Sequence, residues 1–137
     1  MEPQTRDALV AVLADHETLV EVGVGNRTVV AAGLADAGCA VTATDVVERE
    51  VPPGVAFVRD DVTDPDPAVY ADADAVYALN CPPELQGALR DVARSADAAC
   101  YFTTLGADPA RGPVERRTLP GETLFVAPER GPDAGRN

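Results

Sequence analysis

A glycine turn that follows an apolar run constrains the fold of this chain more than any other feature. The run from Leu19 to Val22 has the composition of a buried strand, and it breaks at Gly23 and Gly25. Two glycines at this spacing allow a tight turn and a close approach of the backbone to a ligand. Asp45 follows about 20 residues later, the spacing of the carboxylate that accepts ribose hydroxyls in nucleotide-binding domains. The pattern predicts the nucleotide-binding corner of a Rossmann-like domain.

The rest of the chain alternates between strand and helix patterns, which favours an α/β fold with a doubly wound, mostly parallel sheet. Right-handed crossovers then give the strand order 3-2-1-4-5, with a C-terminal antiparallel edge strand or hairpin around Pro120-Gly121. We expect helices over Thr5 to Asp15, Thr28 to Ala37 and Glu84 to Ser95, and a short turn at Ala68 to Ala71. We expect strands over Thr18 to Val22, Ala40 to Thr44, Val55 to Val58, Ala75 to Leu79, Ala99 to Thr103, Val114 to Leu119 and Thr123 to Ala127.

The composition limits the classes of partner. The chain has 137 residues, which we interpret as a single Rossmann-like domain over residues 1–127 followed by a disordered tail over 128–137. It carries 23 acidic residues against 11 basic ones, all of them arginine, for a formal net charge of −12. Such an acidic, lysine-free chain is typical of proteins adapted to high salt, and the charge argues against nucleic acid as the main partner.

Membrane, metal and disulfide sites are not indicated. We expect a cytoplasmic protein, because there is neither a signal pattern nor an apolar run long enough to cross a membrane. The three cysteines are widely spaced and match no metal-ligand pattern. Cys81 falls near a helix start, but His16 lies at the opposite end of the sheet, so we interpret Cys81 as a structural thiol. A chain this short must build a substrate site from loops or from a second subunit, which leaves a homodimer open.

The predicted topology brings four segments to one crevice at the carboxyl ends of the strands. The turn from Gly23 to Asn26 faces Asn80-Cys81-Pro82-Pro83, with Asp45 on one flank and Asp60-Asp61 beyond it. Asn26 can cap the helix that follows the turn. Asn80 and the aspartates also have a simpler interpretation. Asn80 can cap the next helix, and the aspartates can belong to a salt-adapted surface.

Two ligand patterns compete at the glycine turn. A dinucleotide pattern needs a small residue at Thr28, and the carboxylate of Asp45 would then favour NAD over NADP. The run Glu21-x-Gly23-x-Gly25 resembles the cofactor motif of class I S-adenosylmethionine-dependent methyltransferases, whose third glycine is replaced here by Arg27. That resemblance implies that Glu21 positions the methionine end of the cofactor and that Gly23, Gly25 and Asn26 supply backbone contacts. It further implies that Asp45 binds the ribose and Asp61 the adenine.

Asn80-Cys81-Pro82-Pro83 is similar to the N/D-P-P-Y/F motif of amino-group methyltransferases, in which the Asn or Asp accepts hydrogen bonds from the target amine. Cys81 interrupts that motif, and Glu84 replaces its aromatic residue. The resemblance makes Asn80 the candidate catalytic residue, as the group that orients an acceptor amine. Methyl transfer depends mainly on alignment of the nucleophile with the sulfonium, so the absence of a general base does not exclude it.

Taken together, the leading helix, the V-E-V-G-V-G-N corner, the T-D end of the second strand, the Y-x-L-N-x-P-P-E-L segment and the G-E-T-L-F-V finish resemble uncharacterised protein family 0146. This is a set of small archaeal proteins with a methyltransferase-like Rossmann fold. The resemblance covers nearly the whole chain and implies the fold and, with the acidic composition, a halophilic archaeal source. It implies no particular reaction.

Three functional hypotheses follow. The first is a protein that binds S-adenosylmethionine or a related nucleoside and, if it is an enzyme, acts as a small methyltransferase. The second is an NAD-binding protein, which Thr28 disfavours. The third is a non-catalytic module that senses a nucleotide or binds a partner, which the short chain and the interrupted N-P-P motif favour.

Overall fold

The computed structural model describes residues 1–128 and contains one seven-stranded sheet in the order β3-β2-β1-β4-β5-β7-β6. Strands β3, β2, β1, β4 and β5 are parallel to one another. Strand β7 runs antiparallel to β5. The predicted α/β class, the order 3-2-1-4-5 and the antiparallel C-terminal addition are confirmed. Residues 129–137, nearly all of the predicted tail, lie outside the described residues.

The elements lie within one or two residues of their predicted bounds. The strands are β1 (Thr18–Glu21), β2 (Ala40–Asp45), β3 (Val55–Arg59), β4 (Ala75–Ala78), β5 (Ala99–Phe102), β6 (Glu115–Leu119) and β7 (Glu122–Ala127). The helices are α1 (Pro3–Leu13), α2 (Val29–Asp36), α3 (Pro67–Tyr70) and α4 (Pro83–Ser95). Proline stands in the first turn of α1, α3 and α4, where its missing N–H leaves no intrahelical bond unmade.

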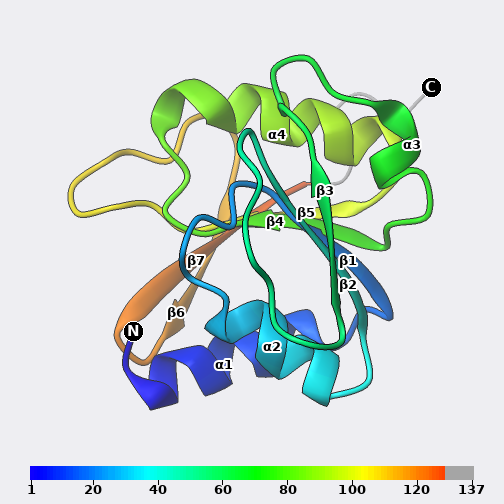
Figure 1. The fold of residues 1–137 in the computed structure, drawn as a ribbon. Helices are drawn as coiled ribbons and strands as arrows, with labels where there is room; N and C mark the ends of the chain where they lie inside the picture. Colours follow the sequence, from blue (N-terminus) through cyan, green and yellow to red (C-terminus); the bar gives the residue numbers. More distant parts are fainter. Residues whose placement is uncertain (129–137) are drawn as a thin grey trace.

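Helices cover both faces of the sheet, with α1 and α2 on one face and α3 and α4 on the other (Figure 1). On the first face Leu9, Leu13 and Leu34 are fully buried in one apolar cluster. On the second face Leu89 and Phe102 belong to another. The central strands are apolar on both sides because each side meets a helix layer, as expected for a parallel sheet.

Two connections depart from a regular alternation of strand and helix. No helix lies between β2 and β3, so Val58 on the edge strand β3 remains exposed. The proline-rich crossover after β3 forms only the single turn of α3, in which the Asp66 carboxylate accepts a hydrogen bond from the Ala68 amide at 3.0 Å. The prolines exclude a longer helix, as the sequence indicates.

The C-terminal segment is both a hairpin and a sheet edge. Pro120-Gly121 forms the turn between β6 and β7, and Gly121 has a positive φ of 74°. The hydroxyl of Thr5, in the first turn of α1, donates to the Pro120 carbonyl at 2.6 Å. This contact ties the start of α1 to the hairpin, while Arg116 and Arg117 lie on the exposed edge strand.

Candidate nucleotide-type site at the glycine corner

The glycine turn joins the end of β1 to α2 at the carboxyl edge of the sheet. Gly23 and Gly25 have φ values of 70° and 57°, and a Cβ atom at either position would meet nothing within 4 Å. Backbone conformation, rather than crowding, therefore requires glycine at both positions. The amide of Val24 donates to the Thr44 carbonyl at 2.9 Å, which anchors the turn to the end of β2.

Asp45 ends β2 as predicted, and its carboxylate is held against the turn. The Gly25 amide donates to Asp45 Oδ2 at 2.8 Å, and the Val47 amide donates to Oδ1 at 3.4 Å. Burial alone would raise the pKa of Asp45, but these backbone hydrogen bonds and the positive charge of Arg49 lower it below its ordinary value. Asp45 is therefore an anion fixed beside the glycine turn.

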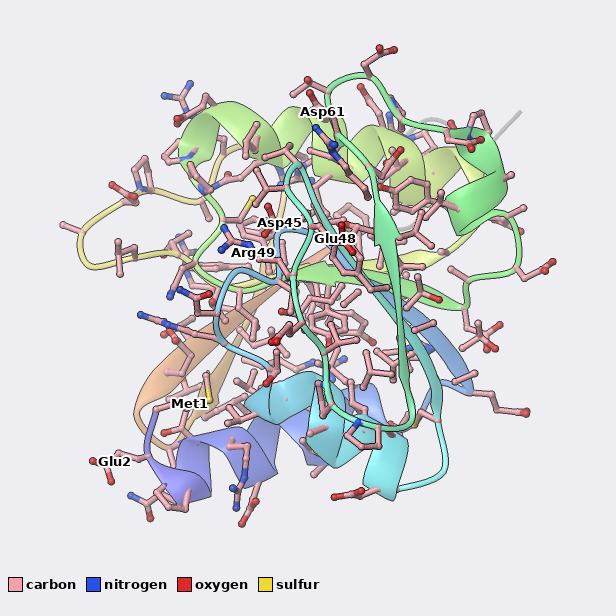
Figure 2. The ribbon with its side chains drawn as sticks, in the orientation of Figure 1. Met1, Glu2, Asp45, Glu48, Arg49 and Asp61 are labelled. Carbon is pink, nitrogen blue, oxygen red and sulfur yellow. The ribbon has the colours of Figure 1, made fainter. Side chains whose placement is uncertain are left out.

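Arg49 is part of this arrangement and was not singled out by the sequence patterns. Its Nε lies 3.3 Å from Asp45 Oδ2, four residues along the chain, and Figure 2 shows the two side chains side by side. Its Nη1 donates to the Asn26 amide oxygen at 3.3 Å. The predicted helix cap at Asn26 is therefore wrong, because its oxygen binds Arg49 and Thr28 is the residue that precedes α2.

Glu21 lies beneath the turn and is 1% exposed. The Tyr77 hydroxyl, on the neighbouring strand β4, donates to Glu21 Oε1 at 2.7 Å. Loss of solvation raises the pKa of Glu21 to about 8, although the Tyr77 hydrogen bond acts to lower it. In the protein without ligand, burial therefore favours the uncharged form of Glu21, which can hydrogen-bond a ligand.

Cavities meet at this edge of the sheet. The corner cavity has a volume of about 200 Å³ and is lined by Glu21, Gly23, Val24, Gly25, Asn26, Arg27, Leu79 and Asn80. An adjoining cavity of about 440 Å³ shares Arg27, Leu79 and Asn80 with it, and is completed by Met1, Glu2, Thr5, Thr103, Gly121 and Glu122. A third, of about 460 Å³, extends from Asn80 over the loop of residues 104–108 and the hairpin. Asn80 borders all three cavities.

Asn80 has an unusual backbone conformation, with a φ of 54°. Its amide donates to the Thr103 hydroxyl at 2.8 Å, which ties the end of β4 to the end of β5. Within residues 1–128 its side-chain amide makes no hydrogen bond, and α4 is preceded by Pro82 without a side-chain cap. Asn80 therefore does not cap the helix, and its side chain is available to a molecule in the cavities.

The conformation of Asn80 predicts how substitutions affect stability. Glycine adopts a positive φ without strain, so Asn80→Gly is expected to change the free energy of unfolding by less than about 0.5 kcal/mol. Asn80→Ala should lower it by about 1 kcal/mol or more, because alanine disfavours this conformation. Urea denaturation of both variants at fixed molar KCl measures the difference. Equal stabilities would show that the backbone of residue 80 is not strained.

Asp60 and Asp61 do not reach the corner cavity. The Asp61 carboxylate is exposed and accepts hydrogen bonds from the Thr63 amide and hydroxyl at 2.9 Å and 2.7 Å. Asp60 accepts one from the Tyr70 hydroxyl at 2.7 Å. Figure 2 places Asp61 apart from Asp45 and Arg49, beyond the end of β3. Of the predicted site residues, Glu21, Gly23, Gly25, Asn26 and Asn80 line the corner cavity together, whereas Asp45 supports it and Asp61 lies outside it.

Cys81 is 4% exposed, and burial, followed by the charge of Glu84, raises the pKa of its thiol to about 11. A protonated, buried thiol is a poor nucleophile, which supports the structural interpretation.

In the part of the chain that the structure describes, no three His, Cys, Asp or Glu side chains form a group that could hold a metal ion. No helix within residues 1–128 is long and apolar enough to cross a membrane.

Comparison with protein families places residues 4–130 in the family described as Uncharacterised protein family (UPF0146). A member of this family from Halobacterium salinarum is 64% identical over 118 residues, which cover 85% of this chain and 92% of the relative. A member from Archaeoglobus fulgidus is 47% identical over 90 residues, covering 66% of this chain and 69% of the relative. The predicted resemblance to an archaeal family is confirmed.

Several solved structures with a similar fold are methyltransferases. An RNA methyltransferase from Salinibacter ruber in complex with S-adenosyl-L-homocysteine matches with a TM-score of 0.64 and 17% identity, covering 97% of this chain and 96% of that one. The magnesium protoporphyrin IX methyltransferase from Synechocystis PCC 6803 with bound S-adenosylmethionine matches with a TM-score of 0.62 and 17% identity, covering 90% of this chain and 76% of that one. At this identity the likeness shows a methyltransferase-like Rossmann fold and leaves the ligand to be argued from the site.

Proposed function

The chain belongs to the Uncharacterised protein family (UPF0146), and from this premise and the geometry of the glycine corner we propose that it binds S-adenosylmethionine or a related nucleoside. The observation that carries the proposal is the Asp45 carboxylate, held 2.8 Å from the Gly25 amide at the end of β2. A fixed anion beside a glycine turn is the arrangement that accepts the two hydroxyls of a ribose. Solved neighbours with the same fold hold S-adenosylmethionine or its product.

In this proposal the ligand lies across the turn from Gly23 to Asn26, with its ribose on Asp45. The buried carboxyl of Glu21 borders the end of the cavity next to β4 and would meet the methionine end of the ligand by hydrogen bonding. Asp61 would contact the adenine from beyond β3, after release of its hydrogen bonds to Thr63. Because Arg49 contacts Asp45 in the structure without ligand, we expect its guanidinium to shift when ribose binds.

We further propose that a methyl transfer, if catalysed, takes place at Asn80. Asn80 borders the corner cavity and the adjoining cavity, so an acceptor in the second would face a cofactor in the first. Its side-chain oxygen can accept a hydrogen bond from an acceptor amine and orient the nitrogen lone pair. Glu2 and Glu122 also line the adjoining cavity, and their carboxylates favour a basic acceptor.

Calorimetric titration in molar KCl with S-adenosylhomocysteine, NAD and ADP-ribose tests the proposal. We expect measurable binding of S-adenosylhomocysteine and at least about tenfold weaker binding of the other two, because the corner lining has one cationic side chain, Arg27, for the two charges of a diphosphate. Binding of NAD or ADP-ribose with greater affinity would replace the proposal with a dinucleotide-binding protein. If none of the three ligands shows measurable binding while the circular dichroism spectrum is that of the folded protein, a non-catalytic partner-binding module is favoured.

A further inference from the structure

Arg27 stands where class I methyltransferases have their third glycine, and it borders both the corner cavity and the adjoining cavity. It is the single cationic side chain among the described residues that line the corner cavity. Glu21, the other ionisable residue of that lining, is buried and bonded to Tyr77. Arg27 therefore brings a positive charge to the corner cavity of a strongly acidic chain.

The guanidinium of Arg27 has no protein partner within residues 1–128, where it makes no ion pair and no side-chain hydrogen bond. Most of the other arginines within residues 1–128 have a carboxylate or a backbone carbonyl as a partner. Carboxylates pair with Arg6, Arg49, Arg94 and Arg117, and backbone carbonyls accept from Arg59 and Arg90. An unpaired arginine at the mouth of a ligand cavity, among many acidic residues, is placed to bind an anion.

We propose that Arg27 is a specificity-determining residue that binds the carboxylate of the ligand's amino-acid end. The inference rests on the proposed function, which places the ribose on Asp45 and the methionine end toward β4. Arg27 borders the adjoining cavity together with Leu79 and Asn80, which follow β4, and so lies at that end of the corner cavity. A guanidinium can form two parallel hydrogen bonds to a carboxylate, which gives orientation as well as affinity.

A matched pair of ligands tests the assignment. S-adenosylhomocysteine carries the carboxylate, and 5′-(3-aminopropylthio)-5′-deoxyadenosine keeps the adenosine, sulfur and ammonium but lacks the carboxylate. The wild-type protein should bind the first about tenfold or more tightly than the second, measured by calorimetry at the lowest KCl concentration that preserves the fold. Arg27→Gln should weaken binding of S-adenosylhomocysteine about tenfold and change binding of the decarboxylated ligand by less than about twofold.

Two variants complete the experiment. Arg27→Lys keeps the charge and should retain part of the preference for the carboxylate ligand. Arg94→Gln removes an exposed arginine of α4, paired with Asp91 at 3.7 Å, and should leave both affinities unchanged. An equal loss for both ligands in Arg27→Gln, or no loss for either, would overturn the inference while the proposed function stands. Failure of the wild-type protein to bind either ligand would overturn both.

Discussion

Replacing Glu21 with glutamine is expected to stabilise the protein at pH 8 by about 2 to 4 kcal/mol and to flatten the fall in stability between pH 5 and 8. Burial raises the pKa of Glu21 from 4.5 to about 8. Below about pH 4.5 both the folded and the unfolded chain carry the proton, so the group has no effect. Between 4.5 and 8 the unfolded chain releases the proton and the folded chain keeps it, so the free energy of unfolding falls as the pH rises. Glutamine has no proton to release and can still accept the hydrogen bond from Tyr77.

Chemical denaturation of the wild-type protein and of Glu21→Gln at several pH values, in one molar KCl concentration, measures this effect. Tyr77→Phe removes the hydroxyl that bonds Glu21 and should lower stability by about 1 to 3 kcal/mol, because the buried acid loses its partner. Glu48→Gln, at an exposed carboxylate, controls for the loss of one negative charge. If the free energy of unfolding of the wild-type protein and of Glu21→Gln changes with pH in the same way over this range, Glu21 is ionised in the folded chain.

Asp45→Ala is expected to lower the affinity for S-adenosylhomocysteine at least about 100-fold. A carboxylate that accepts both ribose hydroxyls makes two charge-assisted hydrogen bonds, each contributing about 1.5 to 3 kcal/mol. Asp45→Asn keeps an oxygen for the Gly25 amide and should lose about tenfold, because its uncharged amide accepts more weakly. Calorimetric titration of each variant measures the affinity, and circular dichroism reports whether the fold is kept.

Three further variants separate ligand contact from indirect effects. Arg49→Gln leaves the Asp45 carboxylate in place and should not weaken binding by more than about threefold. Asp61→Ala should weaken it by about fivefold or less, because that carboxylate is exposed and already accepts from Thr63. Asp36→Ala, at an exposed position near the end of α2, should have no effect. Unchanged affinity in Asp45→Ala would refute the proposed ribose site.

Local patterns were sufficient for the order of the elements and for the place of the glycine corner in the sheet. Apolar runs mark each parallel strand, and the right-handed crossover rule applied to a doubly wound sheet gives the observed strand order. The glycines at 23 and 25 and the acid at 45 mark the corner because a positive φ and a strand-end carboxylate are properties of single positions. The cap predicted at Asn26 failed because a residue 23 positions away, Arg49, binds its oxygen.

The state of each site residue depended on partners that only the tertiary structure supplies. Parallel pairing of β1 with β4 places Tyr77 beside Glu21, 56 residues away in sequence, and burial there raises the pKa of Glu21 to about 8. The convergence of β4, β5, α1 and the hairpin makes Asn80 the common border of three cavities. The sequence by itself determined the fold and the position of the glycine corner, since both follow from short-range periodicity and turn chemistry. The structure decided which carboxyl has a raised pKa and which a lowered one, and which arginine lacks a protein partner within residues 1–128, because solvation and charge pairing depend on residues far apart in the chain.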